Sequence, residues 1–154
     1  MFLLGRIIVI LFALWLATIA AGMTFAFGLL GPGWHAFTGD PVEQGSFWVF
    51  TFFGATLTGA VALLPVLIMV VLAETFKVRS LLAHLAAGAA VLLFAYYGSG
   101  LARPSYEESI DEPPPLIARE AELAAAAGAV FGLVYWAIAG RNAGRWREAR
   151  GPSA

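Results

Sequence analysis

The uncharged stretch from Phe47 to Leu72 most constrains what this chain can fold into. It reads FWVFTFFGATLTGAVALLPVLIMVVL, which is 26 residues with a single proline. A helix needs about 20 apolar residues to cross the hydrocarbon core of a bilayer. Because no water is present there to satisfy backbone N–H and C=O groups, a lone uncharged span of this length has to be helical. This stretch therefore predicts a transmembrane helix.

Three other apolar stretches obey the same rule, and together the four predict an all-α, polytopic membrane protein folded as one domain. Of the 154 residues, 60% are hydrophobic and 12% are charged, whereas soluble domains carry about 25% charged residues. The expected transmembrane helices cover approximately residues 7–30, 46–73, 80–99 and 118–140, and a basic tail occupies residues 141–154.

The first two helices carry further local signals. Asp40 followed by Pro41 suits a helix start, because aspartate accepts hydrogen bonds from free N–H groups and proline fits the first helical position. The second helix is therefore expected to begin near Pro41, ahead of its apolar span. For the first stretch, a cleaved signal peptide ending near Ala20 is the alternative. Apolar residues continue to Leu30, however, and this length favours a retained transmembrane helix.

The placement of basic residues predicts the orientation in the membrane. With the N-terminus in the cytoplasm, the cytoplasmic segments hold seven of the nine Lys and Arg residues, and only Arg103 and Arg119 lie outside. Since cytoplasmic loops carry the excess of Lys and Arg, we expect an N-in/C-in topology with both termini cytoplasmic. Abundant Ala, Gly and Arg are typical of a GC-rich bacterial genome, so the expected location is a bacterial inner (plasma) membrane.

Small residues predict where the helices pack against one another. Thr51, Thr58 and Pro65 are spaced by seven and share one face of the second helix. Small residues let helix backbones approach closely in a membrane, and the fourth helix carries a GxxxG motif of the same kind. The predicted packing positions are Gly54, Thr58, Pro65, Gly128 and Gly132. The alternative function of the threonine face is to line a polar path.

A cytoplasmic polar cluster is predicted where the second helix ends and the third begins. Its members are Glu74, Lys77, Arg79 and His84. His84 is the only histidine in a predicted span, and ionisable groups within membranes are candidates for function. A polar clasp between His84 and Glu74 that joins the helix ends is the favoured interpretation. Bis-histidine haem ligation within one chain is excluded, because His35 lies on the opposite side of the membrane.

The longest predicted loop is acidic and lies outside the cell membrane. Its acidic residues are Glu107, Glu108, Asp111 and Glu112. Attraction of a divalent cation or a basic partner is the functional interpretation of such a run. The spacing lacks the ligand pattern of an EF-hand loop, however, so a solvated acidic face is favoured and no metal site is predicted.

The polar residues also limit which classes of function are possible. None of the four apolar spans contains Asp, Glu, Lys or Arg, the fourth of them running from Leu123 to Ala139 within its helix. This absence argues against proton-coupled or cation-coupled antiport, and no phosphate-binding or catalytic motif is present. We expect a non-catalytic accessory, scaffold or assembly subunit of a membrane complex, not an enzyme, with no cofactor. Its expected partners are the lipid bilayer and other membrane-protein subunits or further copies of the chain, and not nucleic acid. The alternative is a small homo-oligomeric channel or carrier that uses the Thr51/Thr58/Pro65 face.

Overall fold

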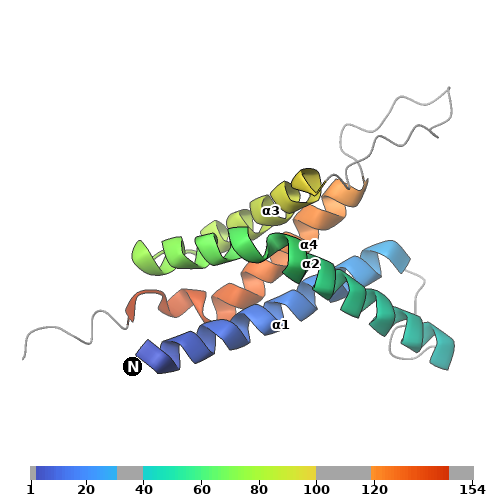
Figure 1. The fold of residues 1–154 in the computed structure, drawn as a ribbon, viewed down its shortest axis with the longest axis horizontal. Coiled ribbons are helices and arrows are strands. Elements are labelled where there is room, and N and C mark those ends of the chain that lie inside the picture. The colour runs from blue at the N-terminus through green and yellow to red at the C-terminus, as the bar shows by residue number, and fades with distance from the viewer. Residues whose placement is uncertain (1–2, 31–39, 100–118, 146–154) are drawn as a thin grey trace, which may run out of the picture.

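A computed structural model describes residues 3–30, 40–99 and 119–145 of the chain (Figure 1). This part contains four α-helices and one short 3₁₀ helix: α1 (Leu3–Leu30), α2 (Pro41–Thr75), α3 (Leu81–Gly98), α4 (Arg119–Ile138) and η1 (Gly140–Asn142). Each of the four α-helices is long and apolar enough to cross a membrane. The prediction of an all-α fold with four such helices is confirmed.

Side-chain caps fix where α2 and α3 begin. The Asp40 carboxylate accepts hydrogen bonds from the N–H groups of Val42 and Glu43, both at 2.9 Å. The Ser80 hydroxyl accepts a longer bond of 3.4 Å from an N–H group in the first turn of α3. The first N–H groups of a helix have no acceptor within the helix, so these side chains stabilise both starts. Helix α2 does begin at Pro41, ahead of its apolar span.

Helix α1 begins at Leu3, four residues before the expected residue 7. Arg6, which the sequence analysis placed ahead of the first helix, therefore lies inside its first two turns. The physical reason is a partner from another helix. The Arg6 guanidinium pairs with the Glu74 carboxylate at the end of α2, so the charge is compensated where it is buried.

Helix α4, the last in sequence, lies between α1 and α3 and packs against both (Figure 1). Helix α2 packs along α1, whereas α2 and α3 make few contacts with each other although they are joined by a short turn. The order around the bundle is therefore α2, α1, α4, α3. The starts of α1 and α3 and the ends of α2 and α4 lie together at one end of the bundle (Figure 1).

Glycines let α3 and α4 approach until their backbones touch. A Cβ atom added at Gly132 would overlap the carbonyl oxygen of His84, and one added at Gly128 would overlap that of Gly88. Helices α1 and α2 cross in the same manner at Gly22. Close backbone packing of this kind is a main source of helix association in lipid, where burial of apolar side chains adds little.

The interior between α1 and α4 combines small residues with large ones. On α1, Ala13, Ala17 and Ala21 are spaced by four and fully buried. On α4, Phe131 and Tyr135 are buried in the same cluster. The alanine row leaves room for the aromatic rings, so the two helices interlock without a large gap.

We predict that Gly132→Ala destabilises the bundle by about 2 kcal/mol, because the new methyl group forces the α3 and α4 backbones apart. Gly59→Ala is the matched control, since a Cβ atom there meets nothing within 4 Å. This control should leave stability unchanged or raise it by up to about 1 kcal/mol through helix propensity. Unfolding of the purified protein followed by circular dichroism measures both. Equal stability of the two variants would contradict the backbone contact.

Candidate functional site

A group of polar side chains lies where four helix ends meet, and we call this region the helix-end junction. It comprises Arg6, Glu74, His84, Tyr135 and the segment 139–144 that follows α4. The Arg6 Nε donates a hydrogen bond of 3.0 Å to Glu74 Oε1, and its Nη2 contacts the same oxygen. The two side chains are only 5% and 11% exposed. The ion pair therefore joins the start of α1 to the end of α2 in a largely buried setting.

The same ion pair also holds the chain that follows α4. Arg6 Nη2 donates a 2.8 Å bond to the carbonyl oxygen of Ala139. The second oxygen of Glu74, Oε2, accepts a 3.0 Å bond from the Gly144 N–H group. Gly144 has a φ of +73°, a left-handed backbone conformation that favours glycine. Three segments distant in sequence thus converge on one carboxylate and one guanidinium.

The turn between α2 and α3 is tied to the α4 end by a second set of bonds. Arg79 Nε donates to the carbonyl oxygen of Ala143 at 3.0 Å. The Trp136 indole Nε1 donates to the carbonyl oxygen of Arg79 at 2.8 Å. Lys77, also in this turn, lies with its aliphatic stem against Gly144. The turn and the α4 end therefore form one bonded unit.

His84 is buried inside the junction, with 2% of its surface exposed. Its Nδ1 lies 2.8 Å from the Ser80 carbonyl oxygen, which can only accept, so Nδ1 donates this hydrogen bond. Nε2 faces Gly140 and has no hydrogen-bond partner among the described residues. The ring stacks on Tyr135 at a centroid distance of 5.8 Å. The buried Tyr135 hydroxyl, a donor, likewise has no partner in the described part of the chain.

The structure thus pairs the polar residues differently from the proposed clasp between His84 and Glu74. Glu74 forms its ion pair with Arg6, and His84 contacts Ser80 and Tyr135. The predicted acidic loop residues Glu107, Glu108, Asp111 and Glu112 lie outside the described residues. Across residues 3–30, 40–99 and 119–145, no three His, Cys, Asp or Glu side chains are grouped so that they could hold a metal ion.

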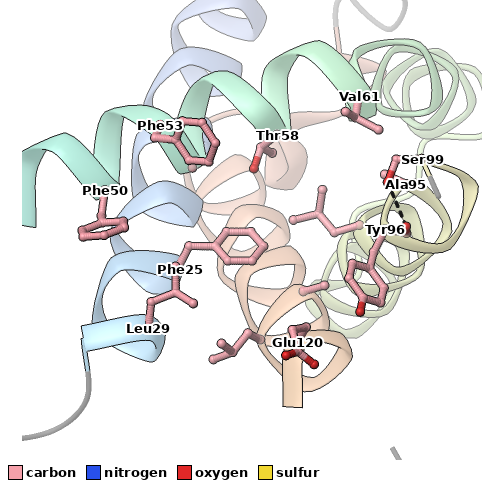
Figure 2. Close-up of a pocket in the computed structure, with 14 residues that line it drawn as sticks. Phe25, Leu29, Phe50, Phe53, Thr58, Val61, Ala95, Tyr96, Ser99 and Glu120 are labelled. Atoms are coloured by element: carbon pink, nitrogen blue, oxygen red, sulfur yellow. Dashed lines mark hydrogen bonds between the residues drawn. The ribbon is translucent and has the colours of Figure 1, made fainter. Parts of the chain in front are cut away.

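A cavity of about 200 Å³ lies among all four helices, toward the end of the bundle opposite the helix-end junction. We call it the four-helix cavity. Phe53 and Thr58 of α2 line one side, and Tyr96 of α3 and Glu120 of α4 lie across from them (Figure 2). The cavity exists because α2 packs on α1 while α3 packs on α4. The wall formed by α2 and the wall formed by α3 therefore stand apart.

A second hollow of about 410 Å³ lies between α2 and α3, nearer the helix-end junction. Pro65 and Met69 of α2 line it together with Ala87 and Val91 of α3, and His84 forms part of its wall. We call it the seam cavity. The loosely packed contact between α2 and α3 therefore contains both hollows.

The predicted packing residues of α2 face two different environments. Gly54 lies against Gly22 and Phe25 of α1, which is a helix crossing. Gly54 and Thr58 both line the four-helix cavity, and Pro65 lines the seam cavity. The GxxxG pair of α4, Gly128 and Gly132, lies at the α3 crossing.

Sequence analysis did not identify three residues that matter for these contacts: Arg6, Gly22 and Gly88. Two of the three, Gly88 and Gly22, lie beside a recognisable spacing pattern in the sequence. Gly88 follows His84 by four residues, the same spacing as the GxxxG pair that it meets. Gly22 directly follows the row of alanines at four-residue spacing on α1. Arg6 resembled an ordinary positive charge at the start of a membrane span, so nothing local marked its partner.

No model of a known protein family matches the chain, and no curated protein or solved structure is significantly similar to it. The class of protein is therefore defined by the fold and the sites themselves. It is an all-helical protein with four helices of membrane-spanning length and apolarity.

Removing one member of the buried ion pair should be costly. We predict that Glu74→Leu destabilises the protein by about 3 kcal/mol, because Arg6 keeps a buried charge without its partner. The double variant Arg6→Met/Glu74→Leu should recover most of that loss, since no unpaired charge is left. Thermal unfolding of the three proteins in one detergent compares them. A double variant no more stable than Glu74→Leu would contradict this account.

Proposed function

We propose that the protein is a bacterial inner-membrane protein with both termini in the cytoplasm, acting as a non-catalytic accessory, scaffold or assembly subunit of a larger membrane complex. The four apolar helices support membrane insertion. The charge distribution supports the orientation, because basic residues collect at the helix-end junction and cytoplasmic segments carry the excess of Lys and Arg. Those in the described part of that end are Arg6, Lys77, Arg79, Arg141 and Arg145.

One observation carries the subunit role, an exposed tryptophan at the midpoint of α1. Trp15 lies 12 residues after Leu3 and 15 before Leu30, and 61% of its side chain is exposed. Tryptophan in membrane proteins prefers the two interfaces, where its N–H group meets water or lipid head groups. No described residue accepts a hydrogen bond from this indole. A neighbouring protein at the depth of Trp15 supplies both packing for its ring and a hydrogen-bond acceptor for its N–H group.

Trp15 belongs to a continuous stripe that we call the α1 docking face. Its members are Ile8, Leu11, Phe12 and Trp15, all exposed. The spacing i, i+3, i+4, i+7 places them on one side of the helix. The rings of Phe12 and Trp15 lie 6.3 Å apart, centroid to centroid. A stripe of this width fits one partner helix, and a buried tryptophan is the residue type that most often dominates interface energies.

The remaining contacts favour a static role. The α3–α4 crossing leaves no room for sliding, since Gly128 and Gly132 already touch the facing backbone. At one end, the ion pair of Arg6 and Glu74 binds three segments together. A bundle held in this way presents the α1 docking face in a fixed geometry, which suits a scaffold.

The experiment places a photo-cross-linking phenylalanine analogue at position 15 in intact cells. The control is position 94, because Phe94 is 71% exposed but lies on α3, away from the docking face. We expect a conjugate with a distinct membrane protein from position 15 and none from position 94. Equal cross-linking at both positions, or lipid adducts alone, would contradict the subunit role. A conjugate of two copies of the chain would favour the homo-oligomer instead.

A small homo-oligomeric channel or carrier is the second candidate. Its support is that Thr58 and Pro65 line the two hollows between α2 and α3. Thr51, the third member of the predicted face, is buried against α1 instead, with its carbonyl at Gly22. The path would therefore exclude Thr51, begin at Thr58 and follow the α2–α3 contact toward Pro65.

This second candidate predicts solute flux in liposomes that falls in Thr58→Val. The substitution keeps the shape of the side chain and removes its hydroxyl, so a polar path would lose one of its few polar groups. Thr56→Val is the control, because the Thr56 hydroxyl bonds its own helix at Phe52 and is exposed on the outer side of α2. Absence of flux in the wild-type protein for all small solutes tested would remove this candidate.

A further inference from the structure

We infer that the four-helix cavity binds the acyl chain of a phospholipid with an amine head group, drawn from the leaflet at the end opposite the helix-end junction. The inference rests on the proposed membrane insertion. It is independent of the α1 docking face, since the cavity is lined by different side chains.

The size and lining of the cavity favour hydrocarbon over water. Its walls are almost wholly apolar and come from all four helices, with Phe25, Phe53 and Leu92 among them (Figure 2). An apolar cavity of about 150 Å³ in another protein stays dry and binds benzene. The four-helix cavity is larger, at about 200 Å³. Water would find few partners along these walls, whereas methylene groups would gain dispersion contacts with them.

The polar groups of the cavity indicate which end holds a head group. Tyr96 and Ser99 lie at the end of α3 and Glu120 in the first turn of α4, so all three are at the rim away from the helix-end junction (Figure 2). Glu120 contributes a carboxylate there. Its neighbour Arg119 is directed toward α1, where it donates a 3.2 Å bond to the carbonyl oxygen of Gly28. A negative group at the rim complements the ammonium group of phosphatidylethanolamine.

The position of the cavity explains why a lipid is the occupant. It lies where α2 and α3 separate, and these two helices make far fewer contacts than the α1–α2, α1–α4 and α3–α4 pairs. In a membrane, the acyl chains that surround the helices are the hydrocarbon closest to this gap. A single chain can enter with its glycerol at the polar rim and its tail toward Thr58.

The test measures lipid retained by the full chain after transfer from nanodiscs, using native mass spectrometry. Ala95 lines the cavity on α3, and Ala95→Phe fills it. Overpacking of this kind should reduce bound phospholipid at least about fivefold. Ala86→Phe makes the same change at an exposed position of α3 and should retain lipid as the wild type does. Equal retention by Ala95→Phe and Ala86→Phe would overturn the inference.

A separate experiment tests the head-group assignment. In nanodiscs with equal amounts of phosphatidylethanolamine and phosphatidylglycerol, the wild type should retain the amine lipid preferentially, and Glu120→Gln should abolish that preference. A wild type that prefers phosphatidylglycerol would overturn the assignment.

A second measurement does not depend on the fold of a variant. A phospholipid with a diazirine in its acyl chain is photolysed with the wild-type protein, and labelled residues are mapped. We expect labels at Leu92 and Leu123, which line the cavity and are buried and half-buried, respectively. Labels confined to outward residues such as Leu82 would overturn the inference. Recovery of the protein without detergent would instead refute membrane insertion, a separate failure.

Discussion

The contact of α3 with α4 at Gly88, Gly128 and Gly132 determines how the rest of the bundle is arranged. Without side chains at these positions, the two backbones touch, and dispersion forces act over the whole crossing. Helix α3 is thereby held by the last helix of the chain and not by α2, which precedes it. Helix α2 packs on α1 instead. Because α2 packs on α1 and α3 packs on α4, the contact between α2 and α3 is loose and contains two cavities.

The two ends of the bundle differ because polar bonds are concentrated at one of them. At the helix-end junction, Arg6 and Glu74 bind α1, α2 and the chain after α4. At the other end α2 diverges from α3 (Figure 1). The four-helix cavity lies at this end. A strong polar closure at one end and an apolar opening at the other suit a protein that is rigid at the helix-end junction and, as proposed, accepts lipid at the opposite end.

The proposed functions depend on exposed or hollow apolar surfaces, and such surfaces appear only once the helices are packed. Trp15 looked like any other apolar residue of the first span, because its exposure depends on which side of α1 faces α2 and α4. Thr58 and Pro65 were recognised as one face of a helix, and that grouping followed from the helical period. Their separation from Thr51, which meets α1, depended on the angle at which α2 crosses α1.

By itself the sequence determined the four helices, the cap at Asp40, and the bias in charge, because hydropathy, capping and period are local properties. It also marked the GxxxG pair as a contact. Only the tertiary structure decided that Arg6 meets Glu74, that His84 stacks on Tyr135, and that α4 lies between α1 and α3. Several helix orders bury similar small residues, so the choice among them rests on side-chain shape across pairs of helices, which no single stretch of sequence contains.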